Sequence, residues 1–156
     1  MAVTTSDAVY RALVEEVAEA VSKHIPSGGV YISDRSVPDT AIEACVQIVP
    51  GGPESMFPRS GTDGVKELFE ITVWKRVVVE PRLKLTESVA SATQGIIAKV
   101  TTSIRRHLKL NTLGDRLHVG LLFLRSSKPS ANQLGSSWVA VTDTYEGRYE
   151  LDDVED

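Results

Sequence analysis

The sequence contains few of the residues from which catalytic and metal sites are built. Its 156 residues include one cysteine, Cys45, and three histidines. A single cysteine excludes an intramolecular disulfide and a cysteine-rich metal site, and His24, His107 and His118 lie too far apart in the chain for a ligand motif. The sequence also lacks a phosphate-binding Gly-x-x-x-x-Gly-Lys loop and a Gly-x-Ser-x-Gly turn. We therefore expect no catalytic residue, no bound metal and no cofactor, which argues against an enzyme.

Long apolar segments are also missing. No run approaches the ~20 residues that a membrane-spanning helix needs, and the beginning of the chain, MAVTTSDAVY, lacks the basic-then-apolar order of a signal peptide. We therefore expect no membrane partner. Hydrophobic residues make up 42% and charged residues 24% of the chain, which is typical of a soluble globular protein. The length suits a single domain over residues 1–156.

The net charge of −4 is unevenly distributed along the chain. Residues 146–156 contain six acids and one base, and they end in an acidic tail at residues 152–156. Residues 82–128, in contrast, contain nine bases and two acids. One interpretation is that the acidic end is simply solvated. Another is that it borders the path of an anion or contacts a basic surface of a partner.

Two segments have the periodicity of amphipathic helices. In residues 6–25, apolar side chains recur at steps of three and four, and Pro26 ends the pattern. Residues 86–109 repeat this spacing over their whole length, and Thr86 suits the N-cap. Basic residues crowd the last turn of the second helix, where cations interact favourably with the helix dipole. This structural role is our first interpretation of the basic cluster.

Four further segments have the apolar patterns of strands: residues 44–49, 65–80, 117–125 and 138–151. The last two predict an antiparallel hairpin with a long loop. Residues 50–64 contain three prolines and four glycines, which predicts a long surface loop. Together these elements predict an α+β fold, in which a mostly antiparallel sheet of about four strands is packed by two helices.

The order of these elements and several local sequences resemble the tail terminator family of bacteriophages, also called tail-completion or minor tail proteins. The likeness includes the opening amphipathic helix, the V-Y-I segment at residues 30–32 and the strand ACVQIV at residues 44–49. The closest local likeness is ELFEITVWKR at residues 67–76, because the family has a similar long strand with a late tryptophan before its second helix. The long segment at residues 50–64 departs from the family pattern.

The resemblance implies a structural protein of the virion, assembled in the host cytoplasm. Proteins of this family form hexamers on the last ring of tail-tube subunits, stop tube polymerisation and present a surface to the neck of the filled head. DNA passes through their channel without being bound specifically. For this chain the implied partners are further copies of itself, the tail tube protein, a neck or head-completion protein and a sheath protein.

Two groups of residues are candidates for these contacts. A ring needs a patch on one subunit that fits a different patch on the next. The candidates for this patch, or for the contact with the tube, are Met56, Phe57, Arg59, Phe69, Ile71, Val73 and Trp74. Trp74 has a second interpretation, because it could instead cover the core. A DNA channel benefits from a lining that does not hold phosphate, and the candidate lining residues are Glu146, Glu150, Asp152, Asp153 and Glu155.

Three other functions stay open on the sequence alone. A head-completion or neck adaptor protein would share the ring-forming architecture and differ in what it binds. A small nucleic-acid-binding α/β domain would use the basic stretch at residues 82–128 and would bind DNA in a salt-sensitive way. A small-ligand enzyme would need a deep pocket that holds two polar groups of perturbed pKa.

Overall fold

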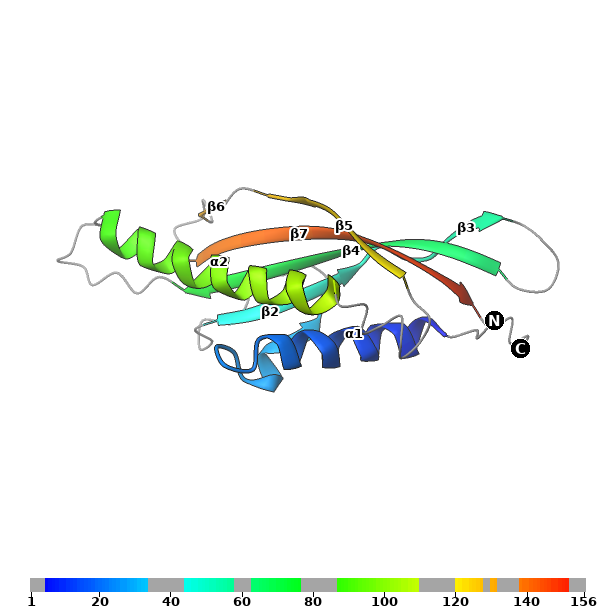
Figure 1. The fold of residues 1–156 in the computed structure, drawn as a ribbon, viewed down its shortest axis with the longest axis horizontal. Helices are drawn as coiled ribbons and strands as arrows, with labels where there is room; N and C mark the ends of the chain where they lie inside the picture. The colour runs from blue at the N-terminus through cyan, green and yellow to red at the C-terminus, as the bar shows by residue number, and fades with distance from the viewer. Residues whose placement is uncertain are drawn as a thin grey trace.

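A computed structural model of the chain describes residues 5–33, 44–57, 63–76, 87–109, 120–127, 130–131 and 138–151. Within these ranges the chain forms two α-helices, one short 3₁₀ helix and seven strands (Figure 1). The elements are, in chain order, α1 (Ser6–Ala20), η1 (Ser27–Gly29), β1 (Val30–Ile32), β2 (Ala44–Pro50), β3 (Glu54–Phe57), β4 (Asp63–Arg76), α2 (Glu87–Lys109), β5 (Gly120–Ser126), β6 (Ser130–Ala131) and β7 (Trp138–Leu151). The expected α+β class is confirmed.

The sheet is mostly antiparallel, as expected, and to the predicted set of about four strands it adds the short strands β1, β3 and β6. Its main order is β1-β2-β4-β7-β5, with β3 paired to β4 and β6 paired to β7. β1 and β2 are parallel, and the other described pairs are antiparallel. The predicted hairpin between the last two long strands is confirmed as the pairing of β5 with β7. β4 and β7 pair along their whole lengths and form the centre of the sheet.

Helix α1 forms where the periodicity predicts it but ends earlier. The side-chain oxygen of Thr5 caps its first turn by accepting a hydrogen bond from the N–H of Ala8, at 3.2 Å. The predicted end at residue 25 is wrong, because the helix stops at Ala20 and the chain tightens into turns. In these turns the N–H of His24 donates to the carbonyl of Val21, at 2.9 Å.

Helix α2 spans Glu87–Lys109 and agrees with the predicted range to within one residue. Its last turn carries basic side chains, as the sequence indicates. Among the described helices, none is both long enough and apolar enough to cross a membrane.

The segment predicted as one surface loop, residues 50–64, is in part a strand, because β3 lies within it and pairs antiparallel with the beginning of β4; residues 58–62 lie outside the described part of the chain. Two of the four glycines that suggested a loop, Gly51 and Gly52, lie in the turn between β2 and β3. The N–H of Gly51 donates to the carbonyl of Leu68, at 2.7 Å, and Gly52 has a φ of 87°. This backbone conformation is available to glycine at little cost.

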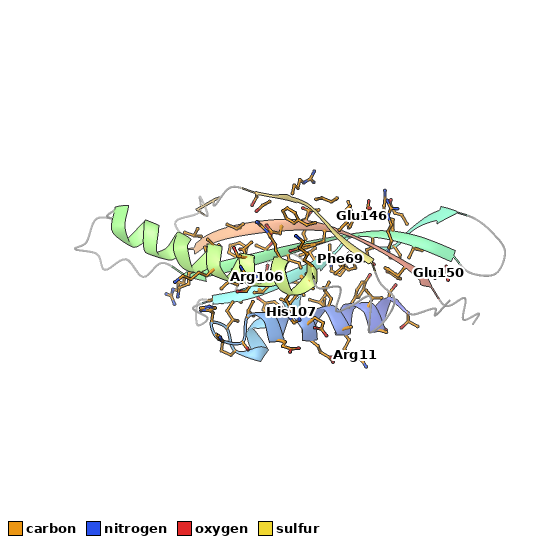
Figure 2. All side chains as sticks on the ribbon, viewed as in Figure 1. Arg11, Phe69, Arg106, His107, Glu146 and Glu150 are labelled. Atoms are coloured by element: carbon orange, nitrogen blue, oxygen red, sulfur yellow. The ribbon has the colours of Figure 1, made fainter. Side chains whose placement is uncertain are left out.

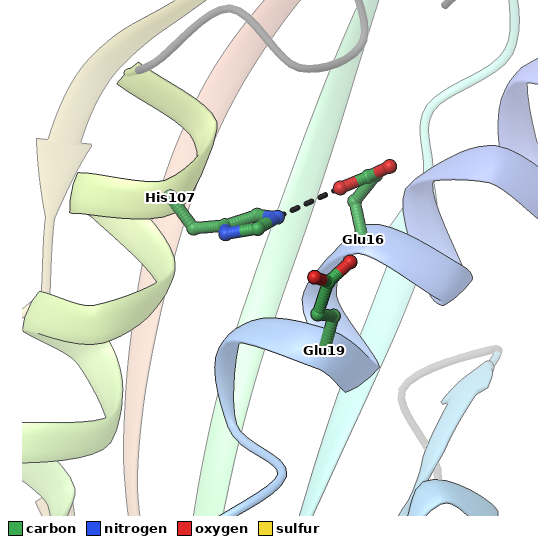
Figure 3. Close-up of side chains that lie close together, drawn as sticks. All are labelled: Glu16, Glu19 and His107. Carbon is green, nitrogen blue, oxygen red and sulfur yellow. Dashed lines mark hydrogen bonds and ion pairs between the residues drawn. The ribbon is translucent and has the colours of Figure 1, made fainter.

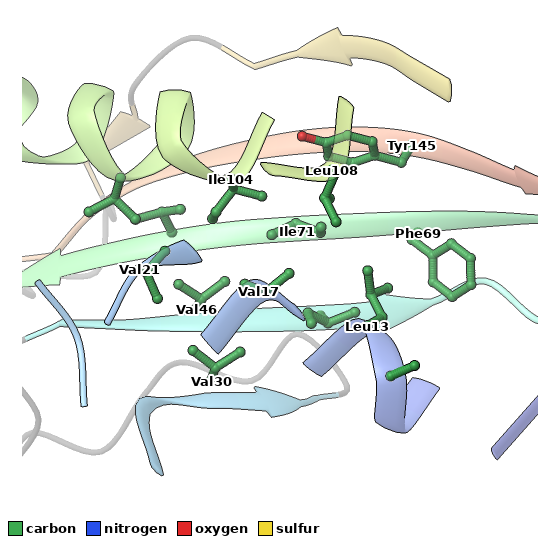
Figure 4. Close-up of a cluster of buried hydrophobic side chains, with 14 of the residues drawn as sticks. Leu13, Val17, Val21, Val30, Val46, Phe69, Ile71, Ile104, Leu108 and Tyr145 are labelled. Carbon is green, nitrogen blue, oxygen red and sulfur yellow. The ribbon is translucent and has the colours of Figure 1, made fainter. Parts of the chain in front are cut away.

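Both helices pack on one face of the sheet, where the core lies (Figure 4). Successive side chains of a strand point to opposite faces, and this alternation directs Phe69, Ile71 and Val73 of β4 toward the helices, where all three are buried. The core is completed from α1, α2 and the neighbouring strands by residues that include Leu13, Val17, Val21, Val30, Val46, Ile104, Leu108 and Tyr145. Removing this apolar surface from water is the main stabilising contribution to the fold.

One carboxylate is buried beside this core. Glu67 on β4 is 1% exposed, and it accepts hydrogen bonds from the hydroxyls of Tyr10 on α1 and Tyr149 on β7, each at 2.5 Å. The N–H of Gly52 donates a third, at 3.0 Å. Burial and the neighbouring Glu67 raise the pKa of Tyr10 and Tyr149. A buried charge is tolerated only when it is hydrogen-bonded, so these donors are what allows Glu67 to tie α1 to the two central strands.

The opposite face of the sheet carries a network of polar side chains. The indole N–H of Trp74 donates to the amide oxygen of Gln47, at 2.9 Å, and the amide nitrogen of Gln47 donates to the hydroxyl of Tyr31, at 3.1 Å. Thr72 and Thr142 share a further hydrogen bond of 2.9 Å across β4 and β7. Within the described ranges, no helix covers this face (Figure 1).

Candidate subunit interface

Strand β5 is the most exposed apolar element of the described chain. It lies last in the strand order and pairs with β7 along one edge only. Three consecutive side chains are exposed on it: Leu122 by 57%, Phe123 by 41% and Leu124 by 44%. An exposed apolar strand at the edge of a sheet is a template for pairing with another chain. The edge formed by β5 is therefore the first candidate for an interface.

A bulge adds one residue, Leu124, to the exposed apolar side chains of β5. Phe123 pairs with Tyr145 and Arg125 pairs with Thr144, so Leu124 is an extra residue in β5. Such a bulge interrupts the regular alternation and bends the strand. Before the bulge the usual alternation holds: Leu122 pairs with Glu146 on the face that no described helix covers, and Phe123 lies on the helix side, only partly covered by Tyr145 and Arg105.

A groove lies between β5 and the end of α2. Its volume is about 570 Å³, and it is lined by Leu121, Leu122 and Phe123 of β5, Tyr145 of β7, and Thr102, Arg105, Arg106, Leu108 and Lys109 of α2. We call it the α2–β5 groove. Its floor and one wall are apolar, while the side chains of α2 add positive charge.

One ion pair joins the α2 wall of the groove to the sheet. Arg105 donates from Nε to Oδ2 of Asp143, at 2.7 Å, and from Nη2 to Oδ1, at 2.9 Å. The same guanidinium lies over the ring of Phe123, 4.7 Å from its centroid. The hydrogen bonds to Asp143 raise the pKa of Arg105. A two-pronged contact of this kind sets the orientation of both side chains, so Arg105 positions the α2 side of the groove.

Tyr145 contributes a polar atom that the described chain leaves without a partner. Its ring is 2% exposed and packs edge-on against Phe123, with 5.6 Å between centroids. Its hydroxyl is buried and has no hydrogen-bond partner among the described residues, and it points toward α2 (Figure 4). Burial and the neighbouring Asp143 raise the pKa of Tyr145. Buried polar atoms are nearly always paired, which makes this hydroxyl a candidate donor to a bound group.

The basic cluster at the end of α2 is only partly neutralised by this chain. Arg105 pairs with Asp143, and His107 shares a hydrogen bond with an acid of α1. Arg106 and Lys109 are exposed, and neither forms an ion pair with a described residue. Both line the α2–β5 groove. The helix dipole favours cations here, but it does not balance their charge, so the rim of the groove is positive.

The acid that pairs with His107 belongs to a small cluster between the helices (Figure 3). His107 Nε2 and Glu16 Oε2 lie 2.7 Å apart. Together with Glu19 they offer three ligand atoms within 4.8 Å of one another, an arrangement from which a divalent cation could be bound. Glu19 is exposed, and the other two side chains already bond to each other. The contact between His107 and Glu16 therefore links α2 to α1.

The residues predicted for the subunit patch do not form one surface. The assignment of Phe69, Ile71 and Val73 to an interface is corrected, because all three are buried in the core under the helices. Trp74 points to the opposite face, where it is half-buried and bonds to Gln47. Neighbouring positions of a strand face opposite sides, so this set cannot gather on one side of β4.

The remaining candidates for that patch lie in or near β3. The backbones of Met56 and Phe57 belong to this strand, and their side chains are outside the described part of the chain. Arg59 also lies outside the described residues.

Two of the predicted channel residues are described. Glu146 accepts a hydrogen bond from Nε of Arg148, at 3.0 Å, and lies 4.0 Å from Nζ of Lys66. Glu150 follows four residues later on the same strand and is partly exposed (Figure 2). The nearby cations balance part of the charge of Glu146. The other candidates, Asp152, Asp153 and Glu155, lie outside the described residues.

The α2–β5 groove was not predicted from the sequence, although one signal for it was present. The sequence LLFL at residues 121–124 is apolar at consecutive positions, so it places apolar side chains on both faces of its strand. Two helices that pack on one face of a sheet cannot cover the apolar side chains on its other face. The order of the strands was still needed to show that this segment lies at an edge.

Comparisons with known proteins assign no family to the chain. A scan against models of protein families finds no match, and a search of curated proteins finds none either.

Proposed function

We propose that this protein is a structural component of a bacteriophage tail, where copies of it close into a ring, cap the tail tube, end its polymerisation and join the tail to the neck of the head. The sequence patterns that resemble tail terminators suggest this role. The observation that carries the proposal is the exposed apolar edge of β5.

An edge strand with three large exposed apolar side chains is a liability in a protein that acts alone. Leu122, Phe123 and Leu124 would instead be covered when a neighbouring subunit docks against this edge. A contact between two different surfaces repeats from subunit to subunit and closes into a ring when the rotation allows it. The position of β5 at one end of the sheet favours this geometry over a contact across the sheet face.

The α2–β5 groove suits binding better than catalysis. Its two perturbed groups are Arg105 and Tyr145, and the pKa of each is raised further above neutrality. General acid–base catalysis works best with a group whose pKa lies near the operating pH. Near neutral pH, Arg105 stays charged and Tyr145 stays protonated, which favours a fixed contact surface over proton transfer.

In this proposal the acidic residues near the end of β7, Glu146 and Glu150, face the DNA channel. Each phosphate contact made by a cation must be broken for DNA to move, whereas carboxylates repel phosphate. Glu150 would supply most of this repulsion, and Glu146 less, because it is paired with Arg148. If cryo-electron microscopy of the ring placed Glu150 on the outer rim, the assignment of the lining would be wrong.

The function is tested by mixing the purified protein with tail tubes assembled from the tube protein of the same phage. We expect electron micrographs to show a ring at one end of each tube and tube growth to stop. Native mass measurement is expected to give about six times the 17.0 kDa of one chain, either free or only on the tube. A stable compact dimer that ignores the tubes would contradict the proposal.

Two alternatives are distinguished by the same preparation. Rings that bind the head connector and leave the tube ends open would identify a neck adaptor. Single chains that bind duplex DNA at low salt and release it at high salt would identify a nucleic-acid-binding domain, for which Arg106 and Lys109 supply exposed positive charge.

A further inference from the structure

We propose that the acidic segment 152–156 of one copy binds in the α2–β5 groove of the next copy and so joins neighbouring subunits head to tail. This inference rests on the proposed ring, and it names the two surfaces that meet. The argument uses the charge of the groove, its unpaired hydroxyl and the distance along β7.

Charge complementarity is the first step. Segment 152–156, with the sequence DDVED, has four acids, one valine and no base. The groove presents two cations on its rim, Arg106 and Lys109, neither of which pairs with a described residue of its own chain. Its apolar wall, with Phe123 and Leu122, suits the valine. An acidic segment with one apolar side chain therefore matches the rim and the wall at once.

The hydroxyl of Tyr145 adds a specific contact. It is buried in the wall of the groove and has no hydrogen-bond partner among the described residues. A hydroxyl donates readily to a carboxylate, and such charge-assisted bonds are stronger than neutral ones. An acidic side chain in the groove would satisfy an atom that the isolated chain leaves unpaired.

Distance favours the segment of a neighbour over the chain's own segment. Strand β7 continues for six residues from Tyr145 to Leu151, and at ~3.3 Å per residue this is about 20 Å. The five residues 152–156 span at most about 18 Å when fully extended. A reversal of direction uses at least two of these residues in a turn, so the segment would run back along β7 by only about 10 Å and would stop short of Tyr145. A contact between these two different surfaces is also the kind that closes into a ring.

The test reverses the charges on each side separately. In Arg106→Glu/Lys109→Glu the groove becomes acidic, and in Asp152→Lys/Asp153→Lys the segment becomes basic. We expect each variant to associate at least ~10-fold more weakly than the wild type in sedimentation velocity, or to leave tube ends uncapped if rings form only on tubes. An equimolar mixture should recover assembly, because each altered groove then meets an oppositely charged segment. Recovery would not follow from a folding defect.

A charge-matched control is Arg11→Glu/Lys23→Glu, which changes two exposed cations that do not line the groove; Arg11 lies on α1, away from Arg106 (Figure 2). It is expected to assemble normally. A second measurement uses a fluorescent peptide of residues 148–156 and records its anisotropy on the wild type, on Arg106→Glu/Lys109→Glu and on Tyr145→Phe. The first variant should bind at least ~10-fold more weakly and Tyr145→Phe several-fold more weakly, while Tyr145→Phe keeps its fold because the lost hydroxyl had no partner.

The outcomes separate this inference from the proposed function. Rings that form equally well with both reversed variants would overturn the groove assignment and leave the tail function standing. An absence of rings in the wild type, free and on tubes, would instead overturn the function. Loss of duplex DNA binding by Arg106→Glu/Lys109→Glu, with assembly unchanged, would show that the groove is a nucleic-acid site and refute the inference.

Discussion

Arg105 on α2 and Asp143 on β7 form a two-pronged ion pair, with distances of 2.7 and 2.9 Å, although they lie 38 residues apart in the chain. Asp143 is 2% exposed, and within the described part of the chain its ion-pair partner is Arg105. The pair holds the end of α2 against the edge of the sheet, beside Phe123. The shape of the α2–β5 groove therefore depends on this contact.

Removing either partner is expected to destabilise the fold. Arg105→Met leaves the carboxylate of Asp143 buried without its partner, and we expect the free energy of unfolding to fall by about 1–3 kcal/mol, less than for a fully buried pair because the arginine is 38% exposed. Urea denaturation measures this change in the free energy of unfolding. A double-mutant cycle with Asp143→Asn isolates the coupling. A coupling below about 0.5 kcal/mol would show that the pair is not what holds α2 here.

The buried carboxylate of Glu67 gives a second prediction. Glu67→Leu leaves the hydroxyls of Tyr10 and Tyr149 and the N–H of Gly52 without their acceptor. Each unpaired buried group costs about 1–3 kcal/mol, so we expect a loss of at least ~3 kcal/mol in thermal or urea unfolding. Glu67→Gln keeps one carbonyl acceptor and is the matched control, with a smaller loss. Equal losses in the two variants would contradict this account.

A third prediction concerns alkaline pH. The pKa values of the four tyrosines are raised, with burial as the largest cause for each. Below about pH 10 the tyrosines are protonated in both the folded and the unfolded states, so their contribution is constant. Above about pH 10 the unfolded chain ionises first, which favours unfolding, and stability is lost as the pH rises toward the folded-state values. Urea denaturation across this range, followed by tyrosinate absorbance, measures the effect.

The matched control for the alkaline loss is Tyr145→Phe, which removes one ionisable group without removing a hydrogen bond. Its stability should fall less steeply above about pH 10 than that of the wild type. Tyrosinate absorbance that rises at about pH 10 before the chain unfolds would refute the prediction.

The turn between β2 and β3 gives a fourth prediction. A Cβ added at Gly51 would lie 2.8 Å from the carbonyl oxygen of Leu68, which is backbone and cannot move aside cheaply. We expect Gly51→Ala to lower the free energy of unfolding by about 1–3 kcal/mol. At Gly28 an added Cβ meets no atom within 4 Å, so Gly28→Ala should be close to neutral. Similar stabilities for the two variants would mean that this turn is not tightly packed.

The edge strand gives a fifth prediction. Leu122→Lys places a charge on an exposed residue of β5 and should change the free energy of unfolding by less than about 0.5 kcal/mol. It should nevertheless prevent ring formation, because an edge lysine blocks pairing with another chain. Leu68→Lys is the control, since Leu68 is similarly exposed, by 43%, but lies on the central strand β4. If assembly were lost in Leu68→Lys and kept in Leu122→Lys, the interface would instead lie on the face of the sheet that no described helix covers.

Much of the fold was predictable because the signals for it are local. The helical spacing of α2 and the alternation in β4 and β7 depend only on near neighbours in the chain, and all three elements lie where the sequence predicts them. Prolines and glycines were less informative. They predicted one loop over residues 50–64, but the described part of this segment holds a turn at Gly51 and Gly52 and then strand β3.

The candidate site was not predictable to the same extent. Phe69 and Trp74 were assigned to one patch, yet one is buried under the helices and the other lies on the opposite face. The charge of the basic cluster also depended on contacts that no local pattern contains. Arg105 is neutralised by Asp143, while Arg106, the next residue, has no described ion-pair partner.

The sequence by itself determined the α+β class, the amphipathic helices, the long central strands and the separation of acidic from basic segments. These properties follow from periodicity and composition, which are readable in one dimension. The tertiary structure decided that β5 lies at an edge, that Tyr145 has an unpaired hydroxyl, and which cations of α2 stay unbalanced. These follow from the order of strands and from pairings between residues far apart in the chain, where each partner is set by the packing of the whole fold.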